Sequence, residues 1–287
     1  MKIRRATDED FDAVFALLDA RSRAAFGISE LQRHYLRHSW ELVEGWVAQD
    51  GGDEIVGYAA LSSAHELSHA AARPEVGDAL LKRVEERARE RDFTHLEATV
   101  VPQDVPFDAL VRRNGFDHDR DILRMWRRLD DGELPAPRWT EGVTVRTYTD
   151  ADAAAVHALL DEAYAGWDEH YVRRPHDDWL AFMTAHDDFD PELWFLVERD
   201  GELVACALHW KVFQQRGWVK DIVVREQERG KGLGTALLHH AFRVYADHDA
   251  VRVGLKVDST NPTGAPKLYE RAGFVTDQRY GIWIKQL

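Results

Sequence analysis

Three glycines stand at alternate positions, Gly230, Gly232 and Gly234, directly before a segment with helical spacing of apolar residues. Because glycine lacks a Cβ atom, the backbone there can adopt positive φ angles and approach a ligand closely. The N–H groups of a helix's first turn have no partner within the helix, and the helix dipole favours negative charge there. The stretch predicts a phosphate or pyrophosphate site; the alternative is a turn that only joins a strand to a helix. Its residues are Arg229, Gly230, Lys231, Gly232, Leu233, Gly234 and Thr235, of which the arginine and the lysine add positive charge.

The segments around these glycines follow the order strand, loop, helix. Residues 219–224 form an apolar run typical of a buried strand, and residues 233–245 repeat apolar side chains at helical spacing. The loop does not match the G-x-x-x-x-G-K-[ST] pattern of P-loop proteins, and Thr235 stands where a dinucleotide fingerprint requires glycine or alanine. The pattern therefore indicates another kind of phosphate ligand.

Two patterns resemble those of the GNAT N-acetyltransferases. Residues 229–234 read R-x-x-G-x-G after a strand, as in that family. A second pattern opens at Asn261 and closes with L-Y-E-x-x-G-F at residues 268–274. Tyr269 lies eight positions after Asn261, where seven is usual, so an extra residue is expected in the turn between them.

The resemblance implies a role for each of these residues. The loop 229–235 and Asn261 are expected to bind acetyl-CoA, with loop amides on its pyrophosphate. Backbone groups of the preceding strand are expected to bind the pantetheine arm as an added strand, and an N–H there would polarise the thioester carbonyl. Tyr269 is expected to protonate the departing thiolate; the alternative is a half-buried aromatic side chain. The strand residues concerned are Ile222, Val223 and Val224.

The group that takes a proton from the amine is a separate question. GNAT proteins that resemble mycothiol synthase carry a glutamate early in this strand, and Trp218 occupies that position here. Asp221, on the same strand, is the candidate general base. Two alternatives stay open. In the first, Asp221 is not a base but is paired with Arg225 or exposed to solvent. In the second, no base is needed, because the amine arrives neutral or loses its proton to water.

The chain contains an internal repeat. Residues 3–19 recur as residues 145–161, and each copy predicts a strand followed by a helix with a Thr-Asp cap. Further pairs follow in the same order, so the chain is predicted to be a duplicated domain. These pairs are hairpins at 46–61 and 195–208, helices at 76–91 and 233–245, and closing strands at 122–129 and 280–287.

The predicted fold class is α/β, with two tandem GNAT-like domains, each a mixed, mostly antiparallel sheet flanked by helices. The domains are placed at residues 1–130 and 143–287, and the Pro-, Gly- and acid-rich stretch 131–142 is the linker. Where the second half has its glycine loop, the first keeps only Gly77, and Val111 stands where Tyr269 stands. The first half is expected to be a degenerate copy with a structural or substrate-shaping role. This layout resembles mycothiol synthase and similar actinobacterial two-domain acetyltransferases.

Composition narrows the class of partner. The 287 residues carry a net charge of −14, which argues against a nucleic-acid partner held by phosphate contacts. The N-terminal residues lack the apolar segment of a secretory signal, and no apolar stretch is long enough to span a bilayer. We therefore expect a cytoplasmic protein with no membrane partner. The single cysteine, Cys206, lies in an apolar run and is expected to be a small buried strand residue rather than a nucleophile.

A His-Glu-x-x-His pattern at residues 65–69 competes with this interpretation, because on a helix it would bind zinc. The repeat aligns His69 with Asp221 and so places the segment in a strand, followed by a helix-breaking Pro74. Side chains four positions apart along a strand are too far apart to bind one ion easily. No metal is predicted, and a zinc hydrolase is the least favoured function.

The predicted function is transfer of an acetyl group from acetyl-CoA to a primary amine of an unidentified small molecule. The acceptor is expected to meet residues 163–171, a segment whose alternative is a solvated loop. A function of another class, a non-catalytic acyl-CoA-binding sensor or partner module, is favoured by the absence of the strand glutamate. The oligomeric state is not predicted. The residues expected to face a cationic amine are Asp168, Glu169, His170 and Tyr171.

Overall fold

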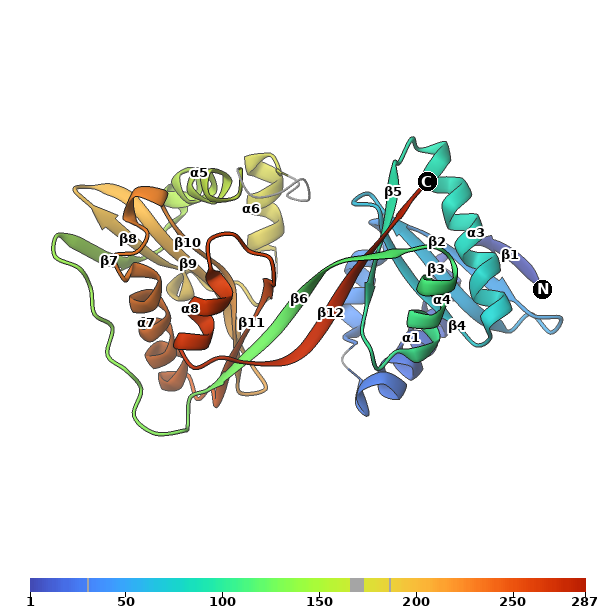
Figure 1. Ribbon diagram of the computed structural model, residues 1–287, viewed down its shortest axis with the longest axis horizontal. Coiled ribbons are helices and arrows are strands. Elements are labelled where there is room, and N and C mark those ends of the chain that lie inside the picture. The colour runs from blue at the N-terminus through green and yellow to red at the C-terminus, as the bar shows by residue number, and fades with distance from the viewer. Residues whose placement is uncertain (30, 166–172, 186) are drawn as a thin grey trace. The chain divides into compact units, whose positions relative to one another are not determined.

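The computed structural model describes residues 1–29, 31–165, 173–185 and 187–287. They form two compact units, of which the first comprises Met1–Ile122 with Arg279–Leu287 and the second comprises Leu123–Gln278 (Figure 1). Each unit is a mixed, mostly antiparallel sheet flanked by helices, which confirms the predicted fold class. The units divide inside two long strands, whereas the predicted domains, 1–130 and 143–287, follow the repeat in the sequence; the latter division stays a prediction.

The sheet of the first unit has the strand order β1-β2-β3-β4-β5-β12. Helices α1 and α2 lie on one face, where Val14 packs against Val47, Tyr58 and Ala60, and α3 and α4 lie on the other. The strands are β1 (Lys2–Arg5), β2 (Val43–Gln49), β3 (Ile55–Ser62), β4 (Glu66–Ala71), β5 (His95–Val100) and the C-terminal part of β12 (Val275–Gln286). The helices are η1 (Asp8–Asp10), α1 (Phe11–Phe26), α2 (Arg33–Trp40), α3 (Pro74–Glu90) and α4 (Val105–Arg113).

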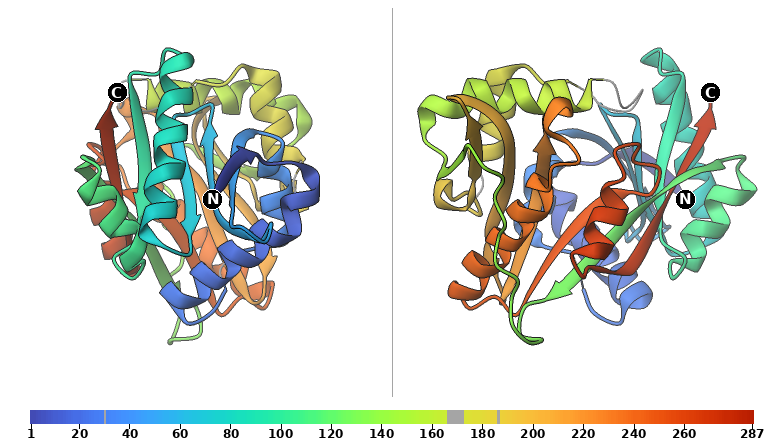
Figure 2. Two further views of the ribbon diagram at one scale, coloured as in Figure 1. Left: turned by 90° about the vertical axis from the view of Figure 1, so that its right-hand side faces the viewer. Right: turned by 60° about the vertical axis from the view of Figure 1, so that its left-hand side comes forward.

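The sheet of the second unit has the order β6-β11-β10-β9-β8-β7. Helices α5 and α6 cover one face and α7 and α8 the other, so the unit has three layers (Figure 2). The strands are the C-terminal part of β6 (Asp117–Arg128), β7 (Val143–Thr147), β8 (Phe195–Arg199), β9 (Glu202–Phe213), β10 (Arg216–Val224) and β11 (Arg252–Asp258). The helices are η2 (Asp150–Asp152), α5 (Ala153–Tyr164), α6 (His176–Thr184), η3 (Pro191–Leu193), η4 (Glu226–Glu228), α7 (Leu233–Asp247) and α8 (Ala265–Arg271).

Each sheet is completed by the closing strand of the other half of the sequence. β12 runs antiparallel to β5, with Gly281 opposite Val100, and Trp283 packs in the core of the first unit. β6 lies beside β11 in the second unit, where the Leu129 N–H donates to the Val251 carbonyl over 2.9 Å. In β6 the buried residues Leu123 and Met125 alternate with less buried neighbours, whereas in β12 the buried residues Gly281, Ile282 and Trp283 are consecutive.

The two copies of the predicted repeat make the same side-chain contacts at equivalent positions. In the first unit Arg4 donates to both carboxylate oxygens of Asp10, over 2.7 and 2.8 Å. In the second unit Arg146 donates to Asp152 over the same two distances. Each aspartate also accepts the N–H of the threonine three residues before it, so both copies enter the helix through a capped 3₁₀ turn. In the part of the chain that is described, no helix is long and apolar enough to cross a membrane.

Candidate active site

The site lies where β10 and β11 separate. The parallel ladder between them covers Arg216 to Trp218, paired with Arg252 to Gly254. β10 continues to Val224 while it stays paired with β9 on its other side, and a β-bulge interrupts that ladder between Val219 and Asp221. Residues 219–224 therefore present a strand edge to the opening between β10 and β11, and such an edge offers N–H and C=O groups to an extended ligand.

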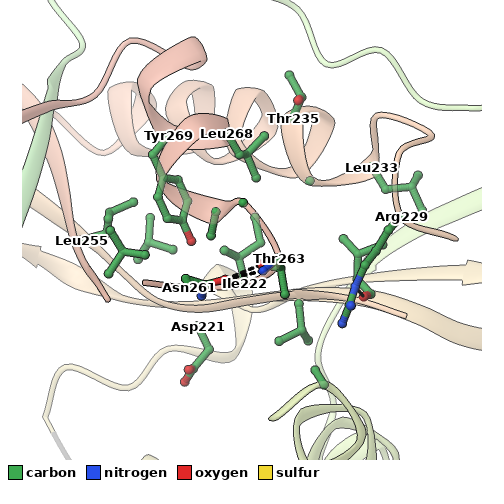
Figure 3. A pocket seen from close by; sticks show the side chains of 18 of the residues that line it. Asp221, Ile222, Arg229, Leu233, Thr235, Leu255, Asn261, Thr263, Leu268 and Tyr269 are labelled. Carbon is green, nitrogen blue, oxygen red and sulfur yellow. Dashed lines mark hydrogen bonds between the residues drawn. The ribbon is translucent and has the colours of Figure 1, made fainter. Parts of the chain in front are cut away.

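This opening is part of a pocket of about 590 Å³. Its walls are β10, β11, the start of α7 and helix α8, together with the end of α5 (Figure 3). The pocket thus brings together every residue predicted for catalysis or for binding acetyl-CoA except Lys231. Those that line it are Asp221, Ile222, Val223, Val224, Arg229, Gly230, Gly232, Leu233, Gly234, Thr235, Asn261 and Tyr269.

Two of the three loop glycines have the predicted conformation. Gly230 has φ +77° and Gly232 has φ +87°, and a Cβ atom added at either would meet open space rather than protein. Gly232 precedes the first residue of α7 and provides no side-chain cap, so the first N–H groups of that helix face the pocket. The prediction of a positive φ is wrong for Gly234, which is helical; its added Cβ would lie 3.1 Å from Leu268, so this glycine permits close packing of α7 and α8.

The charged side chains of the loop form hydrogen bonds within the protein. Lys231 donates to Glu228 over 2.9 Å, and Arg199 donates to the other oxygen of the same carboxylate over 3.2 Å. The hydrogen bond from Lys231 holds the pKa of Glu228 below its usual value. Arg229 donates to the Val224 carbonyl over 3.0 Å. The two loop cations thus offset Glu228 and brace the end of β10, which leaves the helix N-terminus as the main feature for an anion.

Tyr269 reaches from α8 toward the opening between the strands (Figure 3). Its side chain is only 6% exposed and packs against Phe274, with ring centroids 5.8 Å apart. Burial, and secondarily the charge of Asp221, raise the pKa of the Tyr269 hydroxyl well above its usual value. The hydroxyl is therefore protonated at neutral pH and can donate a proton.

Asp221 points from β10 to the side of the sheet away from Tyr269 (Figure 3). It is held by Tyr164, whose hydroxyl donates to Oδ1 over 2.9 Å, and by Lys220, whose ammonium lies 3.1 Å from Oδ2. The side chain is 15% exposed. The alternative that Asp221 pairs with Arg225 is wrong, because that arginine pairs with Glu162 and Glu202 instead.

Asn261 lies in the turn after β11. Its side-chain oxygen accepts the Thr263 N–H over 2.9 Å and the Thr263 hydroxyl over 2.6 Å. These contacts form an Asx turn that leads to Gly264, at φ +75°, and then to α8. The turn accommodates the extra residue expected between Asn261 and Tyr269, so Asn261 contributes by positioning α8 as well as by lining the pocket.

Tyr164 was not singled out by the sequence. It is the last residue of α5, and its partner Asp221 lies 57 positions later in the chain. Spacing along a helix or a strand carries no information about such a contact; the only hint was that Tyr164 belongs to the segment expected to meet the acceptor. Asp168, Glu169, His170 and Tyr171, predicted to face the acceptor, lie outside the described residues.

In the first unit the corresponding strands, β4 and β5, also have a short ladder, and an arginine contacts β4 just beyond it. The ladder between β4 and β5 covers Glu66 and Leu67. Arg21 of α1 donates to the His69 carbonyl just beyond it and forms an ion pair with the buried Asp104. By the repeat, Arg21 corresponds to Ala163, which lines the pocket of the second unit. The second unit thus has a small residue at the position where the first unit has a charged side chain that bonds to β4.

Other sequence candidates take structural positions. Glu66 to His69 lie in β4, as predicted, and His65 occupies the preceding turn at φ +67°. His69 stacks on Phe107, and burial lowers the pKa of His69 to about 3. Among the described residues, no three histidine, cysteine or acidic side chains are grouped to hold a metal ion. Cys206 is fully buried in β9, and burial raises the pKa of its thiol, as expected of an inert strand residue.

A model of the acetyltransferase (GNAT) family matches residues 153–274, which contain this pocket. The mycothiol acetyltransferase of Streptomyces coelicolor is 33% identical over 295 residues, covering 95% of this chain and 90% of that protein. The chain belongs to the GNAT family of acetyltransferases. A GCN5-related N-acetyltransferase from Sphaerobacter thermophilus has a similar structure, with a TM-score of 0.80, 26% identity and coverage of 99% of this chain and 95% of that one.

The tandem arrangement is also found in solved GNAT structures. A tandem GNAT protein from the clavulanic acid biosynthesis pathway matches with a TM-score of 0.78 and 19% identity, covering 99% of this chain and 98% of that one. The chain is thus an acetyl-CoA-dependent N-acyltransferase built from two GNAT-like folds. The pocket fits an acyl donor of this kind, because Gly230 and Gly232 leave open space before an uncapped helix and a free strand edge runs beside it.

Proposed function

We propose that the second unit transfers an acetyl group from acetyl-CoA to a primary amine of a small molecule. The observation that carries the proposal is the pocket itself, which combines the N-terminus of α7, the free edge of β10, Tyr269 and Asp221. The amides of residues 232–235 would bind the pyrophosphate, and residues 222–224 would bind the pantetheine arm through backbone groups. The relatives named mycothiol acetyltransferase make the amine precursor of mycothiol the first acceptor to test.

Each proton of the reaction has a group in the pocket. Asp221 takes one proton from the acceptor ammonium, which frees the nitrogen lone pair to form the C–N bond. As the C–S bond breaks, Tyr269 gives its proton to the sulfur. The proton that the nitrogen loses on becoming an amide restores the Tyr269 phenol, and Asp221 returns its proton to water. The two side chains point to opposite sides of β10, so the acceptor would approach from the α5 side and the thiol would leave on the α8 side (Figure 3).

The donor site is tested by calorimetric titration with acetyl-CoA. Gly232→Asp should abolish binding, because a carboxylate at the start of α7 repels pyrophosphate and an aspartate at φ +87° is strained. Gly201→Asp is the matched control: Gly201 has φ +80°, also faces open space and lies in the β8–β9 hairpin turn away from the pocket. Tight binding by Gly232→Asp, or equal losses in both variants, would contradict the assignment of the loop.

The reaction is tested by thiol release with a panel of amines that includes the amine precursor of mycothiol. Turnover with at least one amine, lost in Asp221→Asn and strongly reduced in Tyr269→Phe, is the expected result. Binding of acetyl-CoA without thiol release for any amine would instead favour the acyl-CoA-binding sensor. A variant Tyr269→Phe with wild-type turnover would refute its role as the acid.

A further inference from the structure

We propose that Tyr164 is a positioning residue that, together with Lys220, fixes the Asp221 carboxylate and sets the pH at which it can accept a proton. The inference rests on the proposed function, because it concerns the proposed base of the same site. It assigns to the end of α5 a part in the reaction, beyond its packing against the sheet.

The contact is specific and lies inside the pocket. Tyr164 and Asp221 both line the cavity, and the hydroxyl donates to Oδ1 over 2.9 Å. Tyr164 is the last residue of α5, whose other apolar residues pack in the core between the helix and β9. Burial, followed by the charge of Asp221 and this hydrogen bond, raises the pKa of Tyr164 well above its usual value. The hydroxyl therefore stays protonated and acts as a donor throughout the pH range of an enzyme assay.

Lys220 reaches the same carboxylate because of the β-bulge in β10. The ladder passes from Val219 opposite His209 to Asp221 opposite Leu208, so Lys220 is the extra residue. A bulge redirects the side chains next to it, and here the Lys220 ammonium lies 3.1 Å from Oδ2 of Asp221. Both carboxylate oxygens thus have a partner, one from α5 and one from the strand itself.

Tyr269 from α8 and Cys206 from β9 also interact electrostatically with Asp221, and both are uncharged at neutral pH because burial raises the pKa of each group. The carboxylate, only 15% exposed, is therefore stabilised by the Tyr164 hydroxyl and the Lys220 ammonium. A carboxylate that loses a hydrogen-bond donor or a nearby cation takes up a proton more readily. Removing either partner should thus inactivate the base at a higher pH than in the wild type.

The first test is the pH dependence of kcat/KM. Tyr164→Phe removes the hydroxyl and keeps the ring, and should move the acid limb of the profile upward by about one pH unit. Lys220→Met should move it in the same direction, while the affinity for acetyl-CoA stays unchanged in both variants. Tyr148→Phe is the matched control. The Tyr148 hydroxyl is buried in the same core and has no hydrogen-bond partner in the described chain, so its removal should leave the limb in place.

The second test does not require turnover. In the full chain labelled with ¹³C at the aspartate carboxyl groups, the Asp221 resonance is assigned by its loss in Asp221→Asn. Its titration midpoint should rise by about one pH unit in Tyr164→Phe and stay unchanged in Tyr148→Phe. An unmoved midpoint in Tyr164→Phe would overturn the inference, as would a lower kcat with an unmoved acid limb, which is the result of a purely structural role.

The outcome also separates this inference from the proposed function. If Asp221→Asn keeps the wild-type limb, the assignment of the base fails and the role of Tyr164 fails with it. If Asp221→Asn removes the limb while Tyr164→Phe leaves it in place, only the role of Tyr164 fails. A shifted NMR midpoint with no acetylation of any amine would support the contact and reject the proposed reaction.

Discussion

His209 makes the second unit sensitive to acid. The side chain is completely buried between Phe195 and Tyr245, with ring centroids 5.3 and 5.5 Å away, and neither ring nitrogen has a hydrogen-bond partner in the described residues. Burial lowers the pKa of His209 to about 3. In the unfolded chain a histidine has a pKa of about 6.5. Between these two values the unfolded chain binds a proton that the native chain does not, so stability is complete above about pH 6.5 and falls as the pH drops toward 3.

The size of the loss follows from the difference in pKa. At pH 5 the unfolded histidine lies about 1.5 pH units below its pKa, which corresponds to about 2 kcal/mol of lost stability from this one residue. Urea unfolding of the wild type and of His209→Leu at pH 7 and pH 5 measures it. The fall in unfolding free energy between the two pH values should be smaller in His209→Leu by about 2 kcal/mol.

A control separates the buried histidine from a general effect of acid. His248 is exposed just after α7, so His248→Leu should show the same fall between pH 7 and pH 5 as the wild type. The reasoning would be refuted if His209→Leu lost as much stability on acidification as the wild type. It would be refuted equally if both leucine variants reduced the fall to the same extent.

Three further predictions concern packing, the first unit and catalysis. Gly217→Ala should destabilise the second unit by about 1–3 kcal/mol in urea unfolding, because the added Cβ would lie 2.5 Å from the Tyr245 ring; an unchanged midpoint would show that the ring moves aside. Arg21→Ala should lower stability by about 2 kcal/mol, because it leaves the buried Asp104 without its cation, and should leave kcat unchanged; a loss of kcat would give the first unit a part in catalysis. Tyr269→Phe should keep the wild-type Kd for acetyl-CoA and lower kcat about 10²-fold or more, measured by thiol release; a weakened Kd would mean that the hydroxyl binds the donor.

The sequence predicted those parts of the site that are continuous in the chain. The glycine loop, the strand before it and α8 each occupy a short segment whose pattern depends on local geometry, and the structure places them as expected. The glycine pattern alone did not separate Gly230 and Gly232, which need a positive φ, from Gly234, which makes room for Leu268. That difference depends on the neighbouring helix, which spacing does not describe.

Contacts between segments that are far apart in the chain could not be predicted from the sequence for the same reason. The Tyr164–Asp221 hydrogen bond joins a helix end to a bulged strand, and a bulge shifts the side-chain alternation on which a strand prediction rests. The side of β10 on which Asp221 lies depends on the extra residue, Lys220. The partner of each closing strand could not be predicted either, because the apolar pattern of a strand does not specify which neighbouring strand it pairs with.

The exchange of closing strands has a consequence for synthesis of the protein. Residues 279–287 follow the whole second unit in the sequence but belong to the first unit, with residues 1–122. The first unit therefore cannot complete its sheet until the second unit has been synthesised, and β5 keeps an unpaired edge until β12 is available. A stop codon placed before residue 279 would spare the pocket-lining segments and damage the unit that is encoded first. Separate expression of the two halves, cut in the stretch 131–142, would leave each sheet without its proper closing strand.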